Sequence, residues 1–174
     1  MLIKPLSFLF ASLALATGAQ TNPSVSYKLV KAGDTHKQLV AAYPSAKCVI
    51  LKTLTRCELR EQDWAGLEPA NVSFFVIDGL VERISVQLKA DTWEKAQAAL
   101  NAQYGASPAS ETPVAAEFET ARYVWKLGNG SLARAQQYGG RDAFVVVTMS
   151  TGKALALEEK SRAARAAPPA KDKG

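Results

Sequence analysis

The sequence predicts an α+β domain in which two short helices pack on a largely antiparallel sheet of five to six strands. Two segments, 34–44 and 91–105, show capped helical periodicity, and the segments between and after them alternate apolar with polar residues. Turn signals separate the strands, which favours hairpins over crossover units. A composition of 48% hydrophobic and 21% charged residues suits one globular domain. The order helix then hairpins occurs twice, which reflects either a degenerate repeat or a chance likeness.

Residues 1–19 have the layout of a secretory signal peptide, with Lys4 ahead of an apolar run at 6–15. Cleavage is expected after Ala19, with Ala16 as the alternative. The run is about half the length that a membrane-spanning helix needs, and no cysteine follows either site, which argues against lipid attachment. We therefore expect an exported protein that is periplasmic or, alternatively, secreted.

Both cysteines of the chain, Cys48 and Cys57, lie in the stretch KCVILKTLTRCE. In an oxidising compartment, without further ligands for a metal, the pair indicates a disulfide. One straight strand over residues 48–57 would place its ends about 30 Å apart, whereas bridged Cα atoms lie within about 7 Å. The chain must therefore turn back between the cysteines, and Lys52 and Thr53 are the expected centre of the turn.

The first helix is expected to begin at Asp34 as N-cap and to end at Pro44, with Leu39, Val40 and Tyr43 on one face. The second helix is expected to begin at Asp91 and to stop at Gly105. Glu94 completes a capping box there. Its buried stripe comprises Trp93, Ala96, Leu100 and Tyr104.

The strongest hairpin signal is Asp78-Gly79 between two alternating runs. A loop of Ile77, Asp78 and Gly79 pairs Val76 with Leu80. In this register one face carries Val72, Phe74, Val76, Leu80, Ile84, Val86 and Leu88, interrupted by Glu82. The other, mixed face carries Ser73, Phe75, Ile77, Val81, Arg83, Ser85 and Gln87.

A second hairpin is expected about 128–130, where Tyr123, Trp125 and Leu127 alternate with polar neighbours. Gly139-Gly140 then turns the chain into an apolar run at 143–150 that suits a central strand. The single domain is expected to span 20–151. Residues 152–174 form a basic Ala/Pro-rich tail, a frayed helix passing into disorder outside the core.

The net charge of +5 is concentrated at the tail. Residues 20–151 hold fourteen basic and thirteen acidic side chains, so the domain carries +1, which argues against a nucleic-acid partner. His36 is expected to pack or cap, because no second ligand accompanies it. The carboxylates Glu58, Glu61 and Asp63 alternate with arginines and indicate a solvated loop. We expect no catalytic residues, no metal, no cofactor and no transmembrane segment.

A resemblance rests on the leader, the helix opening on Gly-Asp-Thr, the nearby cysteine pair and the stretch GLEPANVSFFVIDGLVERISVQL. These features resemble small uncharacterised exported proteins of Gram-negative bacteria. The helix-then-hairpins order over 30–150 is similar to the fold shared by the small lipoprotein of the outer-membrane β-barrel assembly machinery and by the secreted β-lactamase inhibitor protein. The chain departs from that lipoprotein because it lacks the lipid-attachment cysteine. No binding residue carries over.

Five residues make up the candidate partner-binding surface: Phe75, Ile77, Val81, Tyr123 and Trp125. If the two hairpins align, they form an aromatic patch for a protein partner; the alternative is a second small core beneath a helix or the tail. The sequence thus predicts an exported, non-enzymatic binding protein that acts through a sheet face on a periplasmic protein. The alternative is an envelope-assembly or structural accessory whose basic tail contacts membrane or cell wall.

Overall fold

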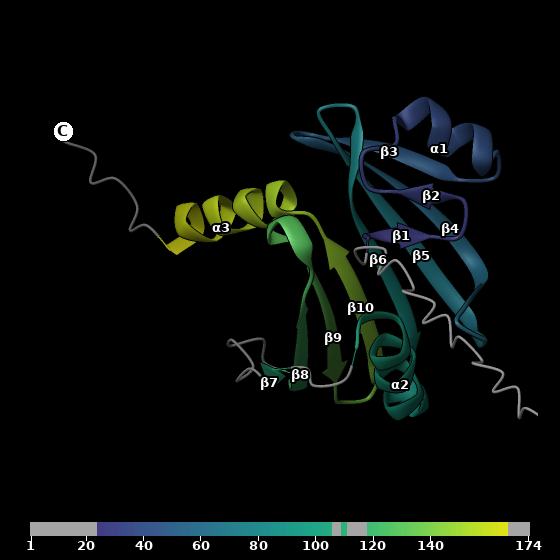
Figure 1. Cartoon of the computed structure of the whole chain (residues 1–174), viewed down its shortest axis with the longest axis vertical. Helices are drawn as coiled ribbons and strands as arrows, with labels where there is room; N and C mark the ends of the chain where they lie inside the picture. The colour runs from purple at the N-terminus through teal and green to yellow at the C-terminus, as the bar shows by residue number, and fades with distance from the viewer. Residues whose placement is uncertain (1–23, 106–108, 111–117, 167–174) are drawn as a thin grey trace, which may run out of the picture.

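The structure is a computed structural model that describes residues 24–105, 109–110 and 118–166. The expected signal peptide, 1–19, and the end of the tail, 167–174, lie outside the described residues. Figure 1 shows the arrangement of the helices and strands.

One antiparallel sheet dominates the fold, with the strand order β3-β4-β5-β6-β10-β9-β8-β7. Its strands are β3 Lys47–Leu51, β4 Leu54–Trp64, β5 Leu67–Ile77, β6 Leu80–Lys89, β7 Ala109–Ser110, β8 Glu119–Lys126, β9 Leu132–Tyr138 and β10 Phe144–Ser150. A separate two-stranded sheet joins β1 Ser26–Tyr27 to β2 Val30–Lys31. The α+β class and the antiparallel sheet are confirmed. Among the described residues the main sheet has eight strands rather than five to six, because the cysteine segment adds β3 and the short β7 extends the far edge.

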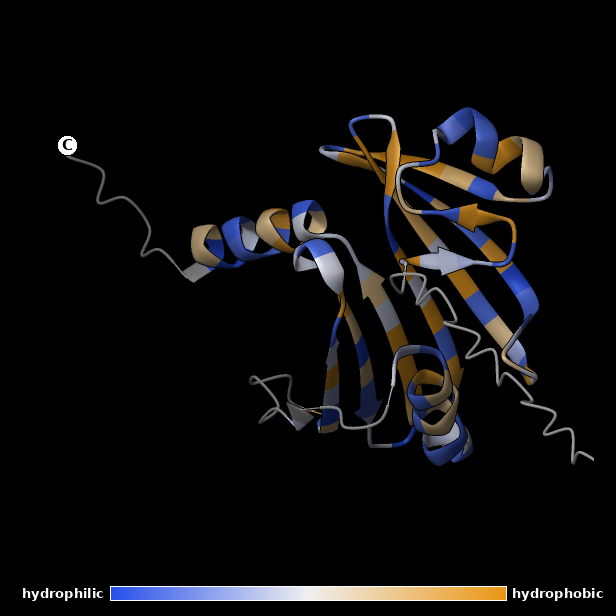
Figure 2. Cartoon of the chain, viewed as in Figure 1, coloured by the Kyte–Doolittle hydropathy of each residue, from blue (hydrophilic) through white to orange (hydrophobic). Residues whose placement is uncertain are grey.

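Helices cover the two faces of this sheet unequally. The core face packs beneath α1 His36–Ala42 and α2 Trp93–Tyr104. α3 Gly152–Ala166 follows β10 (Figure 1), and its Glu158 contacts Arg83 on the opposite face of the sheet. The apolar bands of Figure 2 mark the alternation along the strands. The core buries the following side chains completely: Leu39, Val72, Phe74, Ile84, Val86, Leu100, Val145, Val147 and Met149. Burial of these side chains supplies most of the stabilising free energy of the domain.

Both helices begin differently from the expectation. Thr35, and not Asp34, is the N-cap of α1, and it forms a capping box with Gln38. The Asp34 side chain instead accepts a hydrogen bond from the Lys31 backbone. A 3₁₀ turn, η1 Ala90–Thr92, precedes α2, so Asp91 lies within that turn and does not cap the helix.

The β5–β6 hairpin corrects the expected register. Its turn holds only Asp78 and Gly79, both with positive φ (51° and 82°), and Ile77 pairs with Leu80. Glu82 is an extra residue in β6, because Arg83 pairs with Phe75 while Val81 pairs with Val76. This β-bulge turns Val81 onto the core face, where it is completely buried. Val81 therefore does not belong to the second face.

The β3–β4 hairpin confirms the argument from the cysteine spacing. Leu51 pairs with Leu54, so Lys52 and Thr53 form the turn, and Cys48 lies directly opposite Cys57. The disulfide is present, with an S–S distance of 2.09 Å and Cα atoms 4.0 Å apart.

The segment after Thr151 is helical, as expected for the start of the tail, but it packs on the sheet instead of lying outside the core. It forms α3, and Ala154 in the first turn of this helix is buried. The Thr151 hydroxyl donates to Glu82 Oε2 at 2.5 Å, and the Ala154 backbone donates to the same hydroxyl at 3.3 Å. The bulged residue of β6 thus anchors the start of α3 on the sheet.

Candidate functional site

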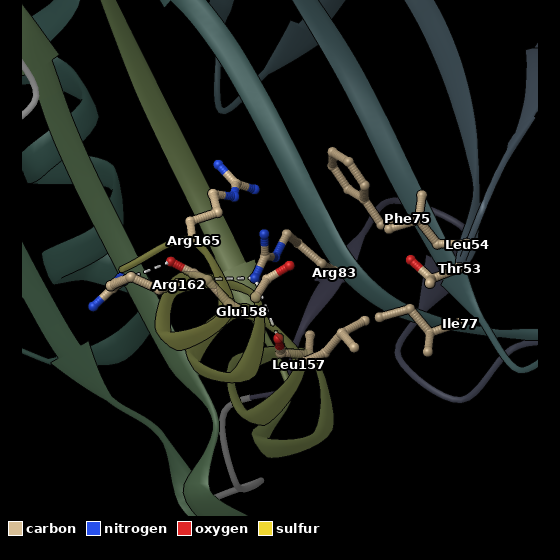
Figure 3. Close-up of a pocket in the computed structure, with 11 residues that line it drawn as sticks. Thr53, Leu54, Phe75, Ile77, Arg83, Leu157, Glu158, Arg162 and Arg165 are labelled. Atoms are coloured by element: carbon tan, nitrogen blue, oxygen red, sulfur yellow. Dashed lines mark hydrogen bonds and ion pairs between the residues drawn. The ribbon is translucent and has the colours of Figure 1, made fainter. Parts of the chain in front are cut away.

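A cavity of about 420 Å³ lies between α3 and the second face of the sheet, and we refer to it as the α3 cavity (Figure 3). Its floor is apolar and comprises Leu54, Phe75, Ile77 and Leu157. Its rim carries Arg83, Arg162, Arg165 and Glu158. Figure 3 shows the arginines of α3 and β6 on one side of this space and the β4 and β5 side chains on the other.

The alternation of β5 explains the floor. Phe74 and Val76 point into the core, so Phe75 and Ile77 point to the opposite face. Phe75 is half-buried and Ile77 is buried. Leu157 follows the buried Ala154 by three residues, so α3 presents both to the same side. Helix and sheet therefore both contribute apolar side chains to the floor of the α3 cavity.

Glu158 holds the rim together. Its carboxylate accepts a hydrogen bond from Arg83 at 2.6 Å and forms ion pairs with Arg134 at 3.5 Å and Arg162 at 3.2 Å. The Arg83 guanidinium also donates to Ser150 Oγ at 3.0 Å and lies 5.8 Å from the Phe75 ring centroid. Arg83 is therefore fixed at the rim by contacts with Glu158, Ser150 and the Phe75 ring.

Charge at this site is strongly unbalanced. Three arginines from β6, β9 and α3 converge on one carboxylate, and Arg165, exposed one turn further along α3, adds a fourth positive charge. Guanidinium groups bind carboxylates and phosphates through paired hydrogen bonds. A cavity with an apolar floor and an arginine rim can bind a ligand that places an acidic group next to an apolar one.

The structure brings together only two of the five residues expected at the binding surface. Phe75 and Ile77 line the α3 cavity. Val81 is in the core, and Trp125 is 4% exposed there, with its indole donating to Asn101 Oδ1 of α2 at 3.2 Å. Tyr123 lies on the same face, with its ring centroid 5.8 Å from that of Trp93. The expected aromatic patch does not form, because β8 places its aromatic side chains on the face opposite to Phe75.

A second cluster joins His36 to the disulfide. His36 Nε2 lies 3.6 Å from Cys57 Sγ, and the ligand atoms of His36, Cys48 and Cys57 all lie within 4.8 Å of one another. Within the described residues no other group of three or more histidine, cysteine or acidic side chains is close enough to hold a metal ion. Sequence reasoning missed this contact because His36 precedes Cys57 by twenty-one residues.

Several charged side chains outside the α3 cavity form ion pairs with one another. Glu119 accepts two hydrogen bonds from Arg122 at 2.7 Å and one from Gln136 at 3.1 Å. Burial raises the pKa of this carboxyl, but the hydrogen bonds and the nearby arginine charges outweigh burial and hold the pKa below its ordinary value. The carboxylates that follow Cys57 lie in strand β4 and not in a loop, because this segment pairs with both β3 and β5. Glu58 pairs with Arg56 at 3.1 Å and Asp63 with Lys28 at 3.8 Å.

Comparison of the chain with protein-family models, curated proteins and solved structures finds no match. Within the described residues, no helix has both the length and the apolar character needed to cross a bilayer. The resemblance to small exported proteins of Gram-negative bacteria therefore stays a prediction.

Proposed function

We propose that the chain is an exported, non-enzymatic binding protein and that a segment of a periplasmic protein partner occupies the α3 cavity. The observation that carries the proposal is the apolar floor of Phe75, Ile77 and Leu157 beside the arginines of the rim. Hydrophobic contact and positive charge are the chemistry of recognition. They hold a ligand without making or breaking its bonds.

The expected ligand is a peptide segment with an apolar side chain beside an acidic one. A space of about 420 Å³ accommodates a few side chains and not a folded domain. An aromatic or aliphatic anchor on the floor supplies the affinity. A carboxylate at the rim would pair with Arg162 and Arg165, the more exposed guanidinium groups.

In the alternative function, the basic side chains of the tail contact the membrane or the cell wall. Arg162 pairs with Glu158, and Arg162 and Arg165 both line the cavity. These contacts favour a role for the arginines in ligand recognition, so we rank protein binding first.

The test uses three forms of the protein: wild type, Arg165→Glu and the matched control Arg141→Glu, which reverses an exposed arginine outside the cavity. Each is used to capture partners from periplasmic extract and is also mixed with vesicles that contain anionic lipid. We expect one identified protein to be captured by wild type and control but not by Arg165→Glu, with no vesicle binding. Capture of the same proteins by all three forms contradicts the proposal, and vesicle binding that Arg165→Glu abolishes supports the membrane alternative.

A further inference from the structure

We infer that Cys48, Cys57 and His36 form a binding site for copper(I) when the disulfide is reduced. The site lies on the core face near the start of α1, away from the α3 cavity, and it is independent of the proposed binding function. In the oxidised protein the two sulfur atoms bond to each other. Reduction converts this cross-link into two thiols beside an imidazole.

Three separate elements hold the ligands in place. His36 is the first residue of α1, and its backbone N–H donates to the Gly79 carbonyl at 3.0 Å. Cys48 and Cys57 lie directly opposite each other on β3 and β4. We expect these backbone pairings to keep the three side chains close together after the disulfide is reduced. A preformed site avoids much of the ordering cost of binding.

The distances fit a metal centre. A metal–sulfur bond of about 2.3 Å and a metal–nitrogen bond of about 2.0 Å place sulfur and nitrogen about 3.5 to 3.7 Å apart. His36 Nε2 and Cys57 Sγ are 3.6 Å apart already. Only Cys48 Sγ has to move outward, and Cys48 is exposed on the edge strand, which leaves room for this movement and a path for the ion.

A small dithiol is a sufficient reductant for the disulfide before copper(I) binds. The dithiol transfers two electrons and two protons to the Cys48–Cys57 disulfide and becomes a disulfide itself. Copper(I) then displaces the proton of each thiol and binds the two sulfur atoms and the Nε2 lone pair of neutral His36.

The ligand set selects the ion. Two thiolates and one imidazole are soft donors, which suit copper(I) and zinc. Structural zinc sites are almost always four-coordinate, and zinc held by only two cysteines and one histidine completes its shell with a water. The described residues offer no fourth histidine, cysteine or carboxylate at this cluster. Soft thiolates select copper(I), which needs no added water at this three-ligand set, so we take copper(I) as the ion, and competition with zinc tests the choice.

The experiment titrates copper(I) anaerobically into reduced wild type in competition with a chromogenic chelator. The oxidised wild type serves as a control of identical sequence. We expect one copper(I) per reduced chain, with thiolate-to-copper absorption in the ultraviolet, and no binding by the oxidised form. His36→Ala should weaken the affinity at least about tenfold, whereas Lys37→Ala, which changes its exposed neighbour, should not. Circular dichroism checks that both variants fold.

Four results would each overturn the inference. They are equal affinity in the oxidised and reduced proteins, absence of binding by the reduced protein, unchanged affinity in folded His36→Ala, and zinc binding that copper(I) does not displace. Cys48→Ser provides a further check, because it removes an exposed ligand without touching the core and should abolish stoichiometric binding.

Discussion

Replacement of Glu158 by Gln should weaken the docking of α3 on the sheet while the rest of the domain stays folded. Glu158 is the carboxylate on which Arg83, Arg134 and Arg162 converge. Glutamine keeps the size of the side chain and one acceptor oxygen but removes the charge. The three guanidinium groups then repel one another without a counter-charge, so the docked position of α3 loses free energy.

The magnitude follows from the exposure of each pair. Arg83 and Glu158 are 22% and 32% exposed and lie 2.6 Å apart, so their charged hydrogen bond contributes about 1.5 to 3 kcal/mol. Arg162 is 60% exposed and one turn away on the same helix, which limits that pair to about 0.5 kcal/mol. Since glutamine retains part of the hydrogen bonding, we expect a loss of about 1 to 2 kcal/mol, a factor of about 5 to 30 in the opening equilibrium of α3.

Hydrogen exchange read by mass spectrometry measures this opening segment by segment. Peptides from α3 should exchange about 5- to 30-fold faster in Glu158→Gln, whereas peptides from β5 and β10 should not change. Glu159→Gln is the matched control, since it removes the same charge from the exposed neighbour on the same helix. Equal effects of the two substitutions would refute the assignment of α3 docking to the Glu158 network.

Three further predictions concern stability. Before reduction neither cysteine should react with an alkylating reagent. Reduction removes the cross-link that restrains the unfolded chain, so it should lower the free energy of unfolding by about 2 to 3 kcal/mol. An unchanged melting temperature would contradict this. Thr35→Ala should cost about 1 kcal/mol in urea unfolding because it removes the capping box of α1; a loss below the error of the fit would show that the cap is dispensable. The folded-state pKa of Glu119 lies below its ordinary value, so its contribution is present above the unfolded pKa and is lost as the pH falls through the folded pKa. Glu119→Gln should therefore lose less stability than wild type on acidification from about pH 6 to pH 3, and parallel acid curves would argue against this role.

The sequence was most informative where one local constraint decides the geometry. Nine residues of separation between two bridged cysteines require a turn, and the structure has that turn at Lys52 and Thr53. The glycines of 128–130 likewise mark the β8–β9 connection, and the apolar run of β10 is a central strand of the sheet. Each of these features depends on a few neighbouring residues.

Register over a longer span was less predictable. Period-two alternation assumes an uninterrupted ladder, but Glu82 is an additional residue in β6, and it moves Val81 from one face to the other. The same dependence on register explains why Tyr123 and Trp125 do not join Phe75 on one face. The face that they occupy is set through several successive strand pairings. No local signal in these segments reports the outcome.

The candidate site was predictable only in part. Strand alternation placed Phe75 and Ile77 on the second face of the sheet, but the helix that covers them depends on the pairing of Arg83 with Glu158, seventy-five residues further along the chain. The Ala/Pro-rich, charged composition of 152–174 predicted a frayed helix outside the core, because it gives no sign of the contacts with the sheet. The contact between His36 and the disulfide is likewise a product of tertiary packing, which brings α1 over the β3–β4 hairpin.

Site-specific photo-crosslinking in intact cells is the most direct test of the α3 cavity as a binding site. A photoreactive residue in place of Leu157 reports on the cavity, and one in place of the exposed Lys95 of α2 reports on the opposite side of the sheet. We predict a discrete protein adduct from position 157 that Arg165→Glu abolishes, and no such adduct from position 95. Adducts from position 95 alone, or an adduct at 157 that persists in Arg165→Glu, would contradict the account.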